Sequence, residues 1–123
     1  MRLNEGGALK ALSEAPLAER DLRAVKAAVG MLRKRFPVEE VIIYGSKVRG
    51  DSDEDSDIDL LLISSRAIQW PERKAIIEAL FDIEMAHEAI ISILIVTAEE
   101  WSSGIFTAFP IYQEIMRDGV LAA

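Results

Sequence analysis

Apolar residues in the first third of the chain recur at alternating gaps of three and four, from about residue 16 to residue 36. That spacing places them on one face of a helix with 3.6 residues per turn. Pro37 follows directly, and a proline disfavours helical backbone at the residue before it. The pattern therefore predicts one amphipathic helix, with its apolar face formed by Ala18, Leu22, Val25, Val29, Leu32 and Phe36.

Three later apolar runs are short enough to be strands: residues 38–44, 58–63 and 89–96. A helix is expected from 71 to 86, where Pro71 suits the first turn. Residues 97–100 have the pattern of a capping box that opens a short helix. A last helix is expected from 110 to 118, closed by Gly119. The sequence shows no internal repeat, so a single domain over residues 1–123 is expected.

The segment between the first two expected strands carries the candidate chemistry. Asp57 and Asp59 are one residue apart at the head of an apolar run, so in a strand both side chains point to the same face. Adjacent carboxylates repel each other, and a divalent cation would compensate their charge. Upstream, Gly45 and Ser46 offer backbone N–H groups and a hydroxyl to a phosphate at the start of a short helix through Arg49. These features indicate metal-assisted chemistry on a nucleoside triphosphate.

This chemistry constrains the topology. Gly45-Ser46 ends the first strand and Asp57 begins the second, so both can contact one nucleotide only if these strands are antiparallel. A helix joins the second strand to the third, which favours a parallel, right-handed crossover. We expect an α/β (α+β) fold with a small mixed sheet in the order first, second, third strand, and with helices packed on it.

The stretch GSKVRGDSDEDSDIDL, residues 45–60, resembles the signature of the nucleotidyltransferase superfamily that includes DNA polymerase beta. It is most similar to the small minimal nucleotidyltransferases. The resemblance implies that Ser46 holds a triphosphate oxygen and that Asp57 and Asp59 bind two Mg²⁺ ions, with ATP as substrate. The matching residues are Gly45, Ser46, Arg49, Gly50, Asp51, Ser56, Asp57 and Asp59.

The superfamily generally has a third acidic residue on the third strand, as metal ligand or general base. Glu88 is the candidate here, in a segment similar to one in which the family has His-Asp; the alternative is a solvated residue at a strand edge. Arg49 either pairs with Asp51 or a neighbouring carboxylate, or reaches the triphosphate. Lys47 is expected at the surface, and Trp70 and Trp101 are expected to be packing residues.

Composition narrows the remaining possibilities. The net charge of −7 argues against a phosphate-neutralising surface for nucleic acid. Six of the nine residues from Asp51 to Asp59 are acidic, but neither possible register has the Gly and Glu of an EF-hand calcium loop. The chain has no cysteine, which fits a cytoplasmic protein, and its single histidine, His87, makes a zinc site improbable. No apolar stretch is long enough to span a membrane.

The resemblance implies a function in partnership with a second protein. Minimal nucleotidyltransferases are commonly encoded beside a helical HEPN-domain toxin, and as antitoxins they adenylylate a tyrosine of that toxin. Two other readings stay open: a degenerate module that neutralises its partner by binding alone, and a small-molecule enzyme of the aminoglycoside nucleotidyltransferase type. A homodimer is also compatible with the sequence.

Overall fold

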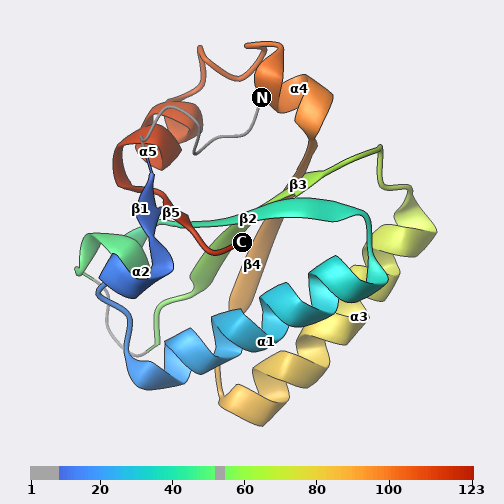
Figure 1. Cartoon of the computed structure of the whole chain (residues 1–123). Coiled ribbons are helices and arrows are strands. Elements are labelled where there is room, and N and C mark those ends of the chain that lie inside the picture. The colour runs from blue at the N-terminus through green and yellow to red at the C-terminus, as the bar shows by residue number, and fades with distance from the viewer. Residues whose placement is uncertain (1–8, 52–54) are drawn as a thin grey trace.

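The computed structural model describes residues 9–51 and 55–123. A five-stranded mixed sheet lies at its centre in the order β1-β5-β2-β3-β4 (Figure 1). The strands are β1 (Lys10–Ala11), β2 (Val38–Tyr44), β3 (Ile58–Ser64), β4 (Ile91–Thr97) and β5 (Val120–Leu121). The helices are α1 (Glu19–Arg35), α2 (Ser46–Arg49), α3 (Trp70–His87), α4 (Ala98–Ser102) and α5 (Pro110–Asp118), with a single 3-10 turn at Leu12–Glu14.

The three longer strands have the predicted order and directions. β2 pairs with β3 antiparallel, with Tyr44 opposite Asp59, and β3 pairs with β4 parallel, with Asp59 opposite Ser92. The mixed α/β fold class is therefore confirmed. The predicted three-strand sheet is incomplete, because β5 pairs with β2 and β1 pairs with β5. These two strands have two residues each, too few for an alternating pattern to be recognised in the sequence.

Each face of the sheet has its own apolar core. Helices α1 and α3 lie side by side against one face, over the β3 side chains Ile58, Leu60 and Leu62 (Figure 1). Helices α4 and α5 are on the other face, where Trp101 and Ile115 pack with Leu61. Asp59 alternates with Leu60 along β3, so it shares the face of Leu61 and of α5. The sheet thus separates the Asp57–Asp59 pair from α1 and α3.

Local sequence explains where the helices begin and end. Glu19 and Asp21 are in the first turn of α1, and three basic residues occupy its last turn, as the helix dipole favours. The predicted capping box is present: Glu100 N–H donates to Thr97 Oγ1 at 3.0 Å, and Thr97 N–H donates to Glu100 Oε1 at 2.8 Å. The predicted helices at 16–36 and 71–86 differ from α1 and α3 by three residues or fewer at either end.

Two predictions about single residues were wrong. Lys47 is buried, with 4% of its side chain exposed, because its Nζ pairs with Asp21 Oδ2 at 2.9 Å beneath α1. Trp70 is 66% exposed, since it begins α3 on the side that faces away from the core. Trp101 is buried as predicted and packs against Tyr112 with ring centroids 5.2 Å apart. Within residues 9–51 and 55–123, no helix is long and apolar enough to cross a membrane.

Candidate functional site

The candidate site begins where β2 ends and β3 starts, on the α5 face of the sheet. Tyr44 pairs with Asp59 across the two antiparallel strands, so the Gly45-Ser46 turn lies beside the aspartate segment. Gly45 has a φ of 84°, a conformation that glycine adopts without strain. A Cβ at Gly45 would collide with Asp59 Oδ2. Only glycine therefore lets the turn pack directly on this carboxylate.

Ser46 opens the four-residue helix α2 immediately after that turn. Gly45 O accepts hydrogen bonds from Val48 N at 3.2 Å and Arg49 N at 3.3 Å, which fixes the direction of the helix. The first turn of a helix has N–H groups with no intrahelical acceptor. Ser46 directly follows Gly45, which packs on Asp59, so the structure brings together the two parts of the sequence that were expected to contact one nucleotide.

Asp57 and Asp59 are held together through β4. Ser92 pairs with Asp59 in the parallel register, and its hydroxyl donates to Asp57 Oδ2 at 2.8 Å. The pKa of Asp59 is raised, first by burial and then by the charges of Asp57 and Glu114, while Arg49 opposes the shift. The two carboxylates thus create an excess of negative charge at a partly buried position. A divalent cation would relieve it, so this donor set fits a metal site with carboxylate and hydroxyl oxygens.

Glu88 lies apart from this pair. It ends α3 in a left-handed conformation with φ of 53°, and it is exposed to solvent. Among the described residues no group of three Asp, Glu, His or Cys side chains is placed to hold one metal. The β4 position beside Asp59 is occupied by Ser92. Glu88 instead faces a hollow of about 380 Å³, whose other lining residues are Arg20, Asp55, Ser56 and Ile90.

Arg49 is engaged by two carboxylates. Its Nη1 lies 2.7 Å from Glu114 Oε1 of α5, and its Nε lies 3.3 Å from Asp51 Oδ2. The predicted pairing with Asp51 is therefore present, and a contact with Glu114 is added to it. This network joins α5 to the short helix that follows the Gly45-Ser46 turn. The pKa of Tyr44 is raised by burial and by the charges of Asp59 and Glu114, which marks the same concentration of negative charge.

Sequence reasoning missed Glu114 and Ser92 as parts of this site. Glu114 approaches only because α5 docks on the sheet, and nothing near it in the sequence signals this. Ser92 had a signal, since it is a polar residue within the apolar run 89–96, a strand that was predicted to be parallel to the aspartate strand. Asp53 and Glu54, two of the six acidic residues from Asp51 to Asp59, lie outside the described residues.

The comparisons with known proteins agree with this geometry. A model of the nucleotidyltransferase domain family matches residues 25–109. The protein adenylyltransferase MntA of Thermococcus cleftensis is 55% identical over 31 residues, which are 25% of this chain and 31% of that protein. A candidate protein adenylyltransferase of Methanocaldococcus jannaschii is 33% identical over 58 residues, 47% of this chain and 59% of that protein. The chain thus spans less than two thirds of either relative.

Two solved structures share the fold. A candidate nucleotidyltransferase from Sulfolobus solfataricus aligns with a TM-score of 0.53 and 23% identity, over 84% of this chain and 82% of that one. A toxin–antitoxin crystallised with AMP-PNP aligns with a TM-score of 0.56 and 15% identity, over 79% and 70%. At these identities they support the fold alone. The family model covers more than half of the chain, including the Gly-Ser turn and both aspartates, and the chain belongs to the nucleotidyltransferase domain family.

Proposed function

We propose that this chain transfers a nucleoside monophosphate, AMP from ATP, to a hydroxyl group of a partner protein. The observation that carries the proposal is the Asp57–Asp59 pair, set on one face of β3 against the Gly45-Ser46 turn. The relatives named as protein adenylyltransferases support the choice of AMP and of a protein acceptor. The need for ATP fits a cytoplasmic location.

In this reaction the acceptor oxygen bonds to the α-phosphorus of ATP, and the bond from that phosphorus to the bridging oxygen breaks. Pyrophosphate leaves, and the hydroxyl proton passes to a base or to water. Asp57 and Asp59 would hold Mg²⁺, which supplies positive charge where negative charge develops. The Gly45-Ser46 turn would hold the triphosphate through its N–H groups and the Ser46 hydroxyl.

Ser92 and Glu88 have different proposed roles. Ser92 holds Asp57 Oδ2 at 2.8 Å and so fixes one metal-binding oxygen in place. Glu88 faces the hollow beside Ser56, next to Asp57, where an acceptor could enter. We assign Glu88 to the acceptor side as a candidate base, with no share in the metal. Glu88→Gln should then reduce transfer and leave nucleotide affinity nearly unchanged.

The partner is proposed to be a HEPN-domain toxin. The structural likeness to a chain of a toxin–antitoxin complex supports a partner of this kind. In that pairing the present chain is the antitoxin, and an AMP attached to a toxin hydroxyl is the neutralising modification.

A second candidate is a binding module that neutralises the toxin without chemistry. It is favoured by one observation: a serine, Ser92, occupies the β4 position beside Asp59. The two candidates differ in whether the partner gains mass and in whether the aspartates are needed.

Intact-mass spectrometry of the partner, after incubation with this chain, Mg²⁺ and ATP, tests the proposal. The partner should become heavier by one or more AMP units, with release of pyrophosphate, and the double variant Asp57→Asn with Asp59→Asn should give no gain. Inhibition without added mass, equal in the native chain and in that variant, would establish the binding module instead.

Two glycine-to-alanine variants, one at the turn and one in α1 as its control, extend this experiment. In Gly45→Ala the added methyl meets Asp59 Oδ2 at a backbone φ of 84°, so the turn must shift. A displacement of about 1 Å at a reacting centre costs about a hundredfold in rate. Gly30→Ala, in α1, adds a methyl with no atom within 4 Å and should transfer AMP at the native rate. Equal rates in the two variants would show that the turn does not position the nucleotide.

A further inference from the structure

Helix α3 carries a stripe of exposed apolar side chains that the proposed reaction does not use. Trp70, Ile77, Phe81 and Met85 are 66%, 43%, 57% and 66% exposed. Their spacings of seven, four and four residues place them within one flank of the helix. Single exposed apolar residues are common, but four large ones in one row mark a surface that is covered by another molecule.

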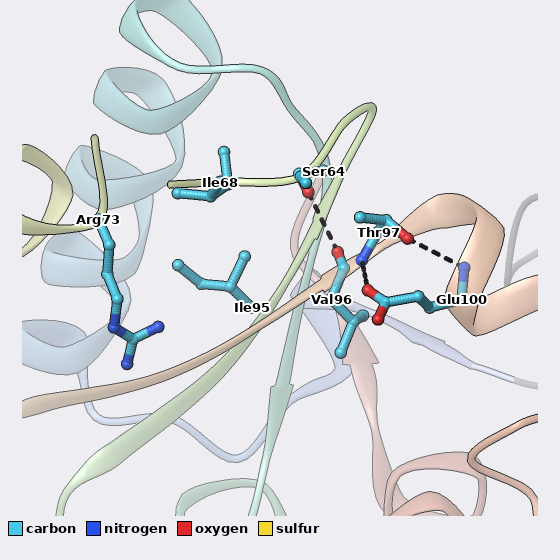
Figure 2. Close-up of a pocket in the computed structure, with 8 residues that line it drawn as sticks. Ser64, Ile68, Arg73, Ile95, Val96, Thr97 and Glu100 are labelled. Carbon is cyan, nitrogen blue, oxygen red and sulfur yellow. Dashed lines mark hydrogen bonds between the residues drawn. The ribbon is translucent and has the colours of Figure 1, made fainter. Parts of the chain in front are cut away.

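This stripe lies on the β4 side of α3. Arg73 lines a cavity of about 190 Å³ with Ile95 of β4, and Figure 2 shows it reaching from α3 toward that strand. Glu84 accepts a hydrogen bond from Ile91 N of β4 at 3.0 Å. Arg73 is on the side of α3 that faces β4. Ile77 follows it by four residues, which places Ile77 about 40° further around the helix axis, so the stripe is next to the side that faces β4. The exposed flank of α3 therefore continues into the edge of the sheet.

Strand β4 forms that edge in the described part of the chain, and its sequence lacks the residues that usually protect an edge strand. The sheet order ends at β4, whose sequence ISILIVT contains no charged residue and no proline. Most edge strands are shielded from pairing by such residues. Six of its seven side chains are half-buried, whereas the adjacent β3 is almost wholly buried. An uncharged, partly exposed edge strand is a template for a further strand.

The outward-facing backbone N–H groups of β4 that lack an acceptor among the described residues are on either side of Leu94. Ile58 N donates to Ile90 O, so even-numbered residues of β4 turn their N–H groups to β3 and odd-numbered ones turn them outward. The outward N–H of Ile91 is taken by Glu84, and that of Thr97 by Glu100. Those of Ile93 and Ile95 have no hydrogen-bond acceptor within residues 9–51 and 55–123.

We infer that a second copy of this chain pairs with β4, antiparallel, about a twofold axis at Leu94. In that register Ile93 of each copy is opposite Ile95 of the other. The N–H and C=O groups of these two residues then form four hydrogen bonds between the copies, which uses both unpaired N–H groups. The two sheets become one continuous sheet with β4 at its centre, and no exposed edge remains on that side.

The helices independently give the same axis. Measured along the strand direction, Glu84 is at the height of Ile91, and Arg73 is at the height of the end of β4. The two lengths agree, because eleven helical residues at about 1.5 Å each and five strand residues at about 3.3 Å each both span roughly 16 Å. By the same scale Leu94 is level with about Ile77. A twofold axis there makes the two α3 helices antiparallel and places Trp70 of one copy beside Met85 of the other.

Charge favours this pairing of identical surfaces. Arg73 near the start of α3 comes within one helical turn of Glu84 of the second copy, a distance that its long side chain spans, and the reverse contact forms by symmetry. Arg66 pairs with Glu72 at 2.8 Å and Lys74 lies 4.0 Å from Glu78, so these charges offset one another and Arg73 supplies the positive charge near the start of α3. The far end is negative through Asp82 and Glu84. The Asp57–Asp59 pair is on the opposite face of the sheet and stays accessible.

The mass of the purified chain in solution tests this inference, by sedimentation or native mass spectrometry. We expect a dimer of twice 13.6 kDa. Phe81→Glu, which puts a carboxylate into the stripe, should weaken dimerisation by at least tenfold. Phe109→Glu is the matched control, because Phe109 is 50% exposed on the other side of the molecule, and it should dimerise like the native chain.

A single introduced cysteine tests the register, because the chain contains none of its own. Leu94→Cys should form a disulfide between copies, since non-hydrogen-bonded antiparallel neighbours have Cα atoms about 4.5 Å apart, within disulfide range. Ile95→Cys should not, because its symmetry mate is diagonal, about 7–8 Å away. A native chain that stays monomeric overturns the inference. Equal cross-linking of the Ile95→Cys and Leu94→Cys chains also overturns it, because that result would reveal another register.

Discussion

At the scale of single residues, Asp59 is the clearest case of a carboxylate in surroundings that disfavour its charge. Its carboxylate is pressed against Gly45, shares its surroundings with Asp57 and Glu114, and is partly buried. Burial and the charges of Asp57 and Glu114 disfavour the ionised form of Asp59 and raise its pKa, and Arg49 offsets them only in part. Such a group persists in a fold when it serves another purpose, and cation binding is the purpose that we propose.

The pKa of Asp59 leads to a prediction for stability. Because the folded-state pKa is raised above the unfolded value, the folded state holds more protons between these two pKa values, and stability falls as pH rises through that window. Asp59→Asn removes this loss. Without divalent cations it should be about as stable as the native chain at acid pH, and more stable at neutral pH by about 1 kcal/mol or less, since the group is partly solvated.

Urea unfolding at acid and neutral pH measures this difference. Asp82→Asn, which removes an exposed carboxylate on α3, serves as the control and should show no comparable gain at neutral pH. An Asp59→Asn chain that is less stable than the native one at neutral pH would show that Asp59 contributes a stabilising contact.

At the scale of elements, a buried ion pair connects the segment that follows the Gly45-Ser46 turn to α1. Lys47 Nζ and Asp21 Oδ2 are 2.9 Å apart, and each side chain is 4% exposed. The pair links the second residue of α2 to the first turn of α1, so the position of the turn depends on the position of that helix. Removing one member leaves a buried charge, which costs about 3–5 kcal/mol.

Lys47→Met should therefore destabilise the chain by about 3–5 kcal/mol, measured by urea unfolding. The double variant Lys47→Met with Asp21→Leu removes both charges and should recover most of that loss. Equal destabilisation in the single and double variants would mean that packing around Lys47, rather than the buried charge left on Asp21, is responsible.

The same elements show how far the sequence predicts the structure. Strands β2, β3 and β4 were predictable because each is a long apolar run. The antiparallel pairing of β2 and β3 followed from the need to bring Gly45 and Asp57 together, and the parallel pairing of β3 and β4 followed from the helix that joins them. The burial of Lys47 was not predictable, because a lysine side chain usually reaches solvent and its partner Asp21 is distant in the sequence. The helix α3 was predicted, but its exposed flank was not. An apolar residue such as Phe81 indicates burial, but the sequence does not distinguish burial in the core of the chain from burial against another molecule.

At the scale of the whole molecule, the sheet separates two surfaces with different tasks. The α5 face carries Asp57, Asp59 and the Gly-Ser turn, whereas α3 and the β4 edge form the proposed contact with a second copy. Ser92 belongs to both regions, because it lies on β4 and its hydroxyl donates a hydrogen bond to Asp57. Its backbone N–H is directed to β3, so pairing at the outer edge leaves its contact with Asp57 in place.

This separation predicts that nucleotide binding does not depend on dimerisation. A ligand that binds only the folded state, at a hundred times its Kd, stabilises it by about 2.7 kcal/mol. Mg²⁺ and ATP should therefore raise the melting temperature of Phe81→Glu by as much as that of the native chain, at equal protein concentration. The double variant Asp57→Asn with Asp59→Asn should show no rise. A Phe81→Glu chain that loses the thermal shift would show that the second copy organises the nucleotide site, through β4 and Ser92.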